Sequence, residues 1–390
     1  MVSFFSRMFI SDYQNYQSPK VRQAYGMLCG SVGIGLNIIL FFGKFLAGIL
    51  SKSIAITADA FNNLSDAGSS LIMLLGFKMA GQKPDTDHPF GHGRIEYLSG
   101  LLVAIAILLM AVELIRNSFD KILHPSSVQF NMVVVIILIV SILVKLYMFL
   151  YNRSIAAKID SAAMAATATD SISDTCATLV VLAATLVGHF TGLQIDGYCG
   201  LLVGAFIFYA GFSAAKDTID PLLGQPAEAD FVKKIEDIVL SFEEIQGIHD
   251  LVVHNYGPGR VMISLHAEVP AEGDILELHD TIDTAEQRLS NELGCEAVIH
   301  MDPICTKDEE TNEMKAVTGQ KLQQIDESLS FHDFRMVKGP THTNLIFDIL
   351  VPYTCKKKDD DILSELEQRV RAEYPNTYLV VKIDRSYVKQ

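Results

Sequence analysis

Long apolar stretches separated by short polar ones fill the first half of the chain. Six of them approach the roughly 20 residues that a helix needs to cross about 30 Å of hydrocarbon. They lie at residues 24–50, 53–79, 97–119, 128–151, 162–188 and 194–213. The pattern therefore predicts an α-helical membrane bundle of six transmembrane helices over residues 24–216, after an N-terminal segment of residues 1–23.

From Asp217 onward the long apolar stretches end and shorter periodic segments begin. The elements expected here are a helix at 230–245, strands at 248–255 and 260–269, a helix at 275–293 and a strand at 296–302. This αββαβ order is typical of a small two-layer domain. We expect residues 217–305 to form an α+β, ferredoxin-like cytoplasmic domain.

The remaining residues, 306–390, repeat the same spacing. The segment IDESLSFHDFRMVKGPTHTNLIFDILVPY aligns with IVLSFEEIQGIHDLVVHNYGPGRVMISLHAEVP, and the later ILSELEQRV and YLVVKID align with IDTAEQRL and AVIHMD. We therefore predict a second, degenerate αββαβ copy at the C-terminal end.

Positive charges predict the orientation of the bundle. Arg7, Lys20 and Arg22 precede the first predicted helix, and Arg153 and Lys158 follow the fourth. Short cytoplasmic loops carry the excess of Lys and Arg. A multi-pass protein of the cell membrane with both termini in the cytoplasm is expected.

Composition and motifs exclude several function classes. The chain is 49% hydrophobic with a net charge of −15, which argues against nucleic-acid binding. It has no P-loop or glycine-rich nucleotide fingerprint and no nucleophile elbow, so neither a nucleotide partner nor an enzyme is expected. The six cysteines have no CxxC spacing and are expected to be packing residues.

Polar residues interrupt two of the apolar stretches at helical spacing. Asp59, Asn62, Asn63 and Asp66 share one face in AITADAFNNLSDAGSS, and Thr167, Asp170, Ser171 and Asp174 share another in ATATDSISDTCAT. Carboxylates inside a bilayer cost several kcal/mol unless they face partners, water or a metal. Hydrogen bonding between helices is the alternative, but it does not explain three ionisable Asp residues. We interpret Asn62, Asp66, Asp170 and Asp174 as one divalent-cation site.

The donor atoms of this site favour hard ions. One amide oxygen and three carboxylates suit Mn²⁺, with Mg²⁺ and Ca²⁺ as competitors, although intrinsic affinity still favours Zn²⁺ over Mn²⁺. Three buried carboxylates cannot all stay ionised at low cost, so the empty site should hold protons that a dication displaces. If the cavity opens alternately to each side, metal/proton antiport follows.

Two segments resemble the cation diffusion facilitators, which are membrane exporters of divalent transition metals. KFLAGILSKSIAITADAFNNLSDAGSS is similar to the family's first-to-second helix signature, and HPFGHGRIEYLSGL to its loop into the third helix. The resemblance covers nearly the whole of the first 305 residues. It implies that the same four residues form the transport site, and that the protein is a homodimer exchanging metal for protons. Zinc-selective members commonly have His at one or two of these positions, whereas this arrangement resembles manganese exporters.

The resemblance implies two further metal sites. In PDTDHPFGHGR, Asp85, His88 and His92 match a second site of some members, although a solvated loop with incidental His is the alternative. The cytoplasmic binuclear site, which suits Zn²⁺ or Mn²⁺, corresponds to His249, His266, His279, His300 and Asp302. Arg94 resembles a residue that forms a charge interlock, for which we expect Asp220 to be the partner.

The alignment of the repeat carries these five cytoplasmic positions onto the C-terminal copy. They fall opposite His332, Asp348, Asp360, Lys382 and Asp384. A Lys at a ligand position repels a dication, so the copy is expected to be structural or an interaction surface.

An Mn²⁺/proton exporter is therefore the leading hypothesis. Its alternatives are a Zn²⁺, Fe²⁺ or Co²⁺ exporter of the same family, a membrane-anchored metal sensor without transport, and a passive channel.

Overall fold

The computed structural model describes residues 2–16, 18–51, 54–124, 132–191, 196–305 and 307–385. The chain divides into two compact units. The first comprises Met1–Gln225 with Tyr256–Gly259, and the second comprises Pro226–Asn255 with Arg260–Gln390.

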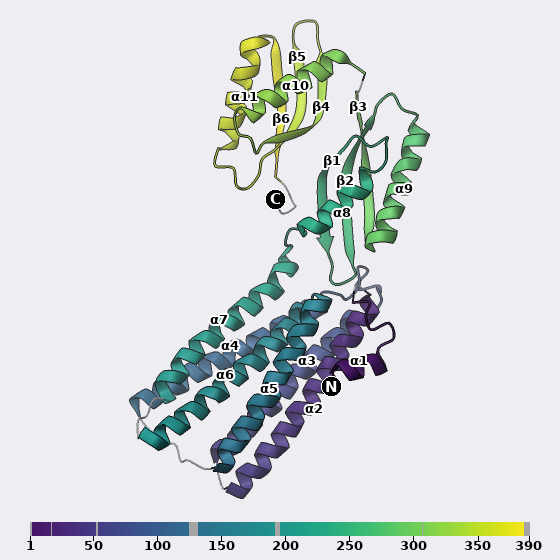
Figure 1. Cartoon of the computed structure of the whole chain (residues 1–390). Coiled ribbons are helices and arrows are strands. Elements are labelled where there is room, and N and C mark those ends of the chain that lie inside the picture. Colours follow the sequence, from purple (N-terminus) through teal and green to yellow (C-terminus); the bar gives the residue numbers. More distant parts are fainter. Residues whose placement is uncertain are drawn as a thin grey trace. The chain divides into compact units, whose positions relative to one another are not determined.

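Long helices lying side by side make up the first unit (Figure 1). After the short helix α1 (Val2–Phe9), its described elements are α2 (Pro19–Ser51), α3 (Ile54–Ala80), α4 (Ile95–Leu123), α5 (Met132–Ile159), α6 (Ala162–Thr191) and α7 (Asp196–Leu223). Within the described residues, α2, α4, α5 and α7 contain spans long and apolar enough to cross a membrane. The two other long helices, α3 and α6, carry the predicted intramembrane acids.

Two apolar clusters hold these helices together. Tyr25, Phe77, Met148 and Met164 are almost fully buried and join α2, α3, α5 and α6. A second cluster, which includes the fully buried Ile107 and Ile207, joins α4, α6 and α7. Large apolar side chains such as those of Leu109, Leu143 and Leu202 are instead exposed on the outside. An apolar exterior around a packed interior is what a lipid solvent requires.

A buried ion pair joins α2 to α4 in the same unit. Arg22 Nη2 lies 2.8 Å from Glu96 Oε1, and their side chains are 9% and 2% exposed. Arg22 also donates hydrogen bonds to the carbonyl oxygens of Ile159 and Asp160, both at 2.6 Å, in the turn between α5 and α6. Ser161 Oγ donates to the same Glu96 oxygen at 2.6 Å. This network therefore links α2, α4 and the turn between α5 and α6.

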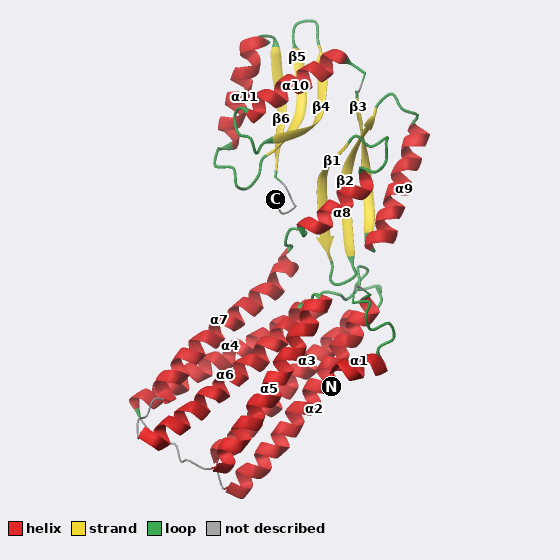
Figure 2. Ribbon diagram, in the orientation of Figure 1, coloured by secondary structure: helices red, strands yellow, loops and turns green. Residues whose placement is uncertain are grey.

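The first module of the second unit follows the predicted element order. It consists of α8 (Ala229–Val239), β1 (Gly247–Asn255), β2 (Val261–Pro270), α9 (Ile275–Leu293) and β3 (Glu296–Ile304). β2 is the central strand, antiparallel to β1 and parallel to β3 (Figure 2). The helix predicted at 230–245 ends earlier, at Val239, where Ser241 Oγ donates to the carbonyl oxygen of Ile238 at 2.7 Å.

The second module contains a further three-stranded sheet. It consists of α10 (Glu309–Gln323), β4 (Ser330–Lys338), β5 (Thr343–Leu350), α11 (Asp359–Glu373) and β6 (Thr377–Asp384). β5 is antiparallel to β4 and parallel to β6, and the module has its own apolar core. Each module has an irregularity in its first strand, where Asp250 and Asp333 adopt positive φ angles of 50° and 53°.

Candidate metal centres

Three carboxylates meet between α3 and α6. Asp66 comes from α3, and Asp170 and Asp174 come from successive turns of α6. One oxygen of each lies within 4.8 Å of the others, and Asp66 and Asp170 are only 9% and 6% exposed. Because residues four apart share a helix face, α6 directs both of its carboxylates the same way. Asn62 lies one turn before Asp66 with an exposed side chain, so its part in this site stays a prediction.

The hydroxyl groups that accompany these acids on α6 bind their own helix. Thr167 Oγ1 donates to the carbonyl oxygen of Ala163, and Ser171 Oγ donates to that of Thr167, both at 3.1 Å. Such bonds to the preceding turn are usual for Ser and Thr in apolar helices. The carboxylates are therefore the groups on α6 best placed to receive a cation.

A lysine that sequence reasoning missed lies in the middle of this cluster. Lys145 of α5 has its Nζ 2.7 Å from Asp66 Oδ2 and 2.5 Å from Asp174 Oδ2, and its side chain is 3% exposed. The signal was available, because Lys145 interrupts the otherwise apolar run VVVIILIVSILVKLYMFLY. An ionisable residue inside such a run is by default a functional candidate. The ammonium group thus lies where a metal ion would lie, between two of the three carboxylates.

The loop between α3 and α4 brings together its three predicted ligands. Asp85 Oδ1 lies 3.5 Å from His88 Nδ1, and Asp85 Oδ2 lies 3.4 Å from His92 Nε2. The backbone N–H of His88 donates to Asp85 at 2.7 Å, which together with the N–H of Asp87 lowers the pKa of that carboxyl. His92 Nδ1 is buried without a hydrogen-bond partner among the described residues. One ion could be held here by one carboxylate and two imidazoles.

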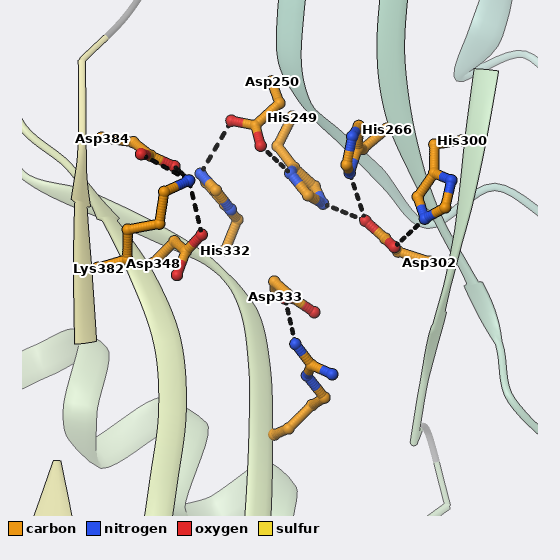
Figure 3. Close-up of polar contacts among 11 residues, drawn as sticks. His249, Asp250, His266, His300, Asp302, His332, Asp333, Asp348, Lys382 and Asp384 are labelled. Atoms are coloured by element: carbon orange, nitrogen blue, oxygen red, sulfur yellow. Dashed lines mark hydrogen bonds and ion pairs between the residues drawn. The ribbon is translucent and has the colours of Figure 1, made fainter. Parts of the chain in front are cut away.

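Cross-strand pairing assembles a further cluster in the first module. His249 of β1 pairs with His266 of β2, which pairs in turn with His300 of β3. Asp302 lies among them: its Oδ2 is 2.8 Å from His266 Nδ1 and 3.2 Å from His249 Nε2, and its Oδ1 is 3.3 Å from His300 Nε2 (Figure 3). His279 is on α9, exposed and 3.7 Å from Asp283, so its membership stays a prediction.

The electrostatics of this cluster suit a cation. Burial alone would lower the pKa of His249, but the carboxylates of Asp250, Asp302 and Glu268 raise it overall. Imidazole and carboxylate donors converging in this way are the ligands that Zn²⁺ and several other divalent transition metals use. The cluster can therefore hold a metal ion with three protein ligands, His249, His266 and Asp302.

The corresponding positions of the second module form an ion-pair network instead. Lys382 Nζ lies 2.9 Å from Asp384 Oδ1 and 3.6 Å from Asp348 Oδ2 (Figure 3). Its hydrogen bond to Asp384 raises the pKa of Lys382, which keeps the ammonium group charged. A positive charge between these two carboxylates occupies the place that a dication would need.

The two residues of the predicted charge interlock lie at different helices of the first unit. Arg94 lies immediately before α4, with its guanidinium carbon 4.5 Å from the centre of the Tyr256 ring. Asp220 lies near the end of α7. Their pairing stays a prediction.

Comparison with protein families gives two adjacent matches. Residues 31–223 match the cation efflux transmembrane domain, and residues 227–304 match the cytoplasmic domain of cation efflux proteins. Both matches end before the second module.

Several relatives are similar over about 70% of this chain. An uncharacterized transporter of Methanocaldococcus jannaschii, MJ0449, is 31% identical over 69% of this chain and 95% of its own length. The manganese efflux system protein MneS of Bacillus subtilis is 25% identical, over 70% and 94%. The cation-efflux pump FieF of Escherichia coli is 26% identical, over 73% and 95%.

Proposed function

Starting from the fact that the chain belongs to the cation efflux (cation diffusion facilitator) family of membrane transporters, we propose that it exports divalent transition-metal cations, Mn²⁺ foremost, in exchange for protons. The observation that carries this proposal is the buried cluster of Asp66, Asp170 and Asp174 with Lys145 among them. Oxygen donors without imidazole or thiolate suit Mn²⁺ better than Zn²⁺. The name of one relative, a manganese efflux protein, supports the same ion.

The charges of the cluster support exchange for protons. When all groups are ionised, three carboxylates and one ammonium carry a net charge of −2, which one dication neutralises. Two ionised carboxylates within 4.8 Å of each other repel by about 3.5 kcal/mol or more at an effective dielectric constant of about 20. Protons therefore replace the metal when it leaves, and the metal displaces them when it binds.

Lys145 is the residue that makes this exchange reversible. In the metal-free site its ammonium group bridges Asp66 and Asp174, as a cation would. An arriving dication has to displace it from at least one carboxylate, so the site binds metal firmly enough to select it and weakly enough to release it. Metal and ammonium thus compete for the same oxygens.

All six long helices of the first unit cross the bilayer in this proposal. Four are apolar enough to do so by composition, and α3 and α6 place their acids in the interior of the bundle, where partners offset their cost. The excess of Lys and Arg near the N-terminus and after the fourth predicted helix supports a cytoplasmic location for both termini. The match to the cytoplasmic domain of the family supports a homodimer.

Residues 306–390 are, in the same proposal, a degenerate copy of the first cytoplasmic module. The element order, the strand order and the irregularity in the first strand are shared. The cross-strand partners also correspond: His249 faces His266 in one sheet, and His332 faces Asp348 in the other.

The experiment that tests the transport proposal is Mn²⁺ uptake into proteoliposomes with and without an imposed pH gradient, for the intact chain and Asp170→Ala. Flux that requires the gradient and is lost in the variant supports the proposal. Flux of Zn²⁺, Fe²⁺ or Co²⁺ in preference to Mn²⁺ would favour the alternative exporter. No flux of any of these ions, with metal still bound by the cytoplasmic unit, would favour a sensor without transport.

A further inference from the structure

Equivalent histidines of the two cytoplasmic modules contact each other. His249 of β1 and His332 of β4 stack with ring centres 4.2 Å apart and ring planes inclined by 16° (Figure 3). The two residues hold the same position in their sheets, one opposite His266 and the other opposite Asp348. A contact between equivalent residues is the signature of a two-fold arrangement. The second module thus faces the first as an internal partner.

Asp250 lies beside this stacked pair and reaches both rings. Its Oδ2 is 3.7 Å from His249 Nδ1, and its Oδ1 is 3.7 Å from His332 Nε2. One ligand atom from each of the three residues lies within 4.8 Å of the others. The positive φ of Asp250, 50°, belongs to the irregular part of β1 that directs its side chain here.

The ring nitrogens at this junction lack hydrogen-bond partners. The side chains of His249 and His332 are only 7% and 11% exposed, and both nitrogens of each ring are buried without a hydrogen bond among the described residues. A separation of 3.7 Å is too long for a hydrogen bond. It is close to the spacing of about 3.3–3.6 Å between two ligand atoms that each lie about 2.0–2.2 Å from one tetrahedral ion.

We propose that His249, Asp250 and His332 bind a divalent transition-metal ion at the junction of the two modules. The donor set of two imidazoles and one carboxylate suits Zn²⁺ and its spectroscopic substitute Co²⁺. This junction site is distinct from the cluster around Asp302, although it shares His249. Nδ1 of that ring faces Asp250, whereas Nε2 faces Asp302.

The junction site gives the second module a role in metal binding that the ion-pair network around Lys382 does not provide. Lys382 places an ammonium group at one of the aligned ligand positions, whereas His332, at another, completes a site with the neighbouring module. A bound metal ion would cross-link the two modules by coordination to ligands from both of them. The C-terminal module therefore responds to metal by being held against the first one, independently of transport.

The test is a Co²⁺ titration of the full chain in detergent, followed by visible absorption, in an Asp170→Ala background that removes the transport site. Asp250→Asn and His332→Asn are each added to this background. Asn tolerates positive φ, so Asp250→Asn removes the charge while preserving the backbone. His342→Asn is the control, because His342 is an exposed histidine of the same module.

Both junction variants are expected to lower the affinity for one Co²⁺ by at least about tenfold. Replacing a residue that only orients a metal ligand already lowers metal affinity by about 10–100-fold. The control should bind as the background does. If Asp250→Asn matches the control in both Co²⁺ affinity and visible absorption, the proposal of a junction site is refuted, whether or not His332→Asn folds. Transport activity enters none of these readouts, so the outcome is separate from that of the proposed function.

Discussion

Replacing Lys145 by Met tests whether an ammonium group substitutes for the metal ion in the proposed transport site. The substitution keeps a long apolar side chain but removes the charge that lies 2.7 Å from Asp66 and 2.5 Å from Asp174. At an effective dielectric constant of about 20, each of these attractions is worth about 6 kcal/mol before desolvation. Removing one partner of a buried ion pair typically costs about 3–5 kcal/mol, because the charge that remains is uncompensated.

The expected loss of stability depends on pH and on metal. At high pH the carboxylates are ionised and repel one another, so Lys145→Met should be destabilised by about 3–5 kcal/mol relative to the intact chain. As the pH falls, protons neutralise the carboxylates and the difference should shrink. Mn²⁺ should shrink it as well, since the dication restores the missing positive charge.

Thermal unfolding of the full chain in detergent, followed by circular dichroism across a pH series with and without Mn²⁺, measures this effect. Lys158→Met is the matched control, because Lys158 is an exposed lysine at the end of the same helix. A difference between Lys145→Met and the intact chain that is independent of both pH and Mn²⁺ would refute the reasoning. The loss would then reflect packing alone.

Three other substitutions have definite expected results. Glu96→Gln should lower the free energy of unfolding by about 3–5 kcal/mol in a denaturation experiment, because Arg22 is left buried without its carboxylate; an unchanged midpoint would contradict this. Asn62→His should shift competitive uptake in proteoliposomes from Mn²⁺ toward Zn²⁺, because it adds an imidazole to an oxygen site; unchanged ion preference would remove Asn62 from the site. Lys382→His should add one Co²⁺ site per chain in an absorption titration, because an imidazole replaces an ammonium group that repels metal; an unchanged number of sites would show that the second module lacks more than this ligand.

Much of the fold could be predicted because it depends on local periodicity. The six apolar stretches correspond to α2–α7, and strand alternation located β1–β3 to within a few residues. The four-residue spacing of Asp170 and Asp174 was enough to place both carboxylates on one helix face. Local periodicity of this kind can be read from the sequence because it records which face of each segment is buried.

The missed features depend on contacts between distant segments. Lys145 reaches Asp66 across 79 positions of the chain, and Arg22 reaches Glu96 across 74. Nothing in the spacing around either residue indicates its partner. For Lys145, a charge inside an apolar run signals that a partner must exist. Arg22 precedes the first apolar stretch and gives no such signal.

The contact between the modules was also beyond sequence reasoning. Alignment of the repeat placed His332 opposite His249 in an equivalent position, but it did not predict that the two rings touch. That contact depends on how one sheet packs against another, which strand periodicity does not record. The family resemblance also assigns His279 to the cytoplasmic ligands; the structure has it exposed on α9, and its membership stays a prediction.

Simultaneous recording of Mn²⁺ and proton fluxes in the same proteoliposomes tests the central claim most directly. The intact chain is predicted to move protons opposite to Mn²⁺ in a fixed ratio, and Asp170→Asn to lose both fluxes together. Mn²⁺ movement without any accompanying proton movement, or a full flux in Asp170→Asn, would contradict the account of a carboxylate site that exchanges one for the other.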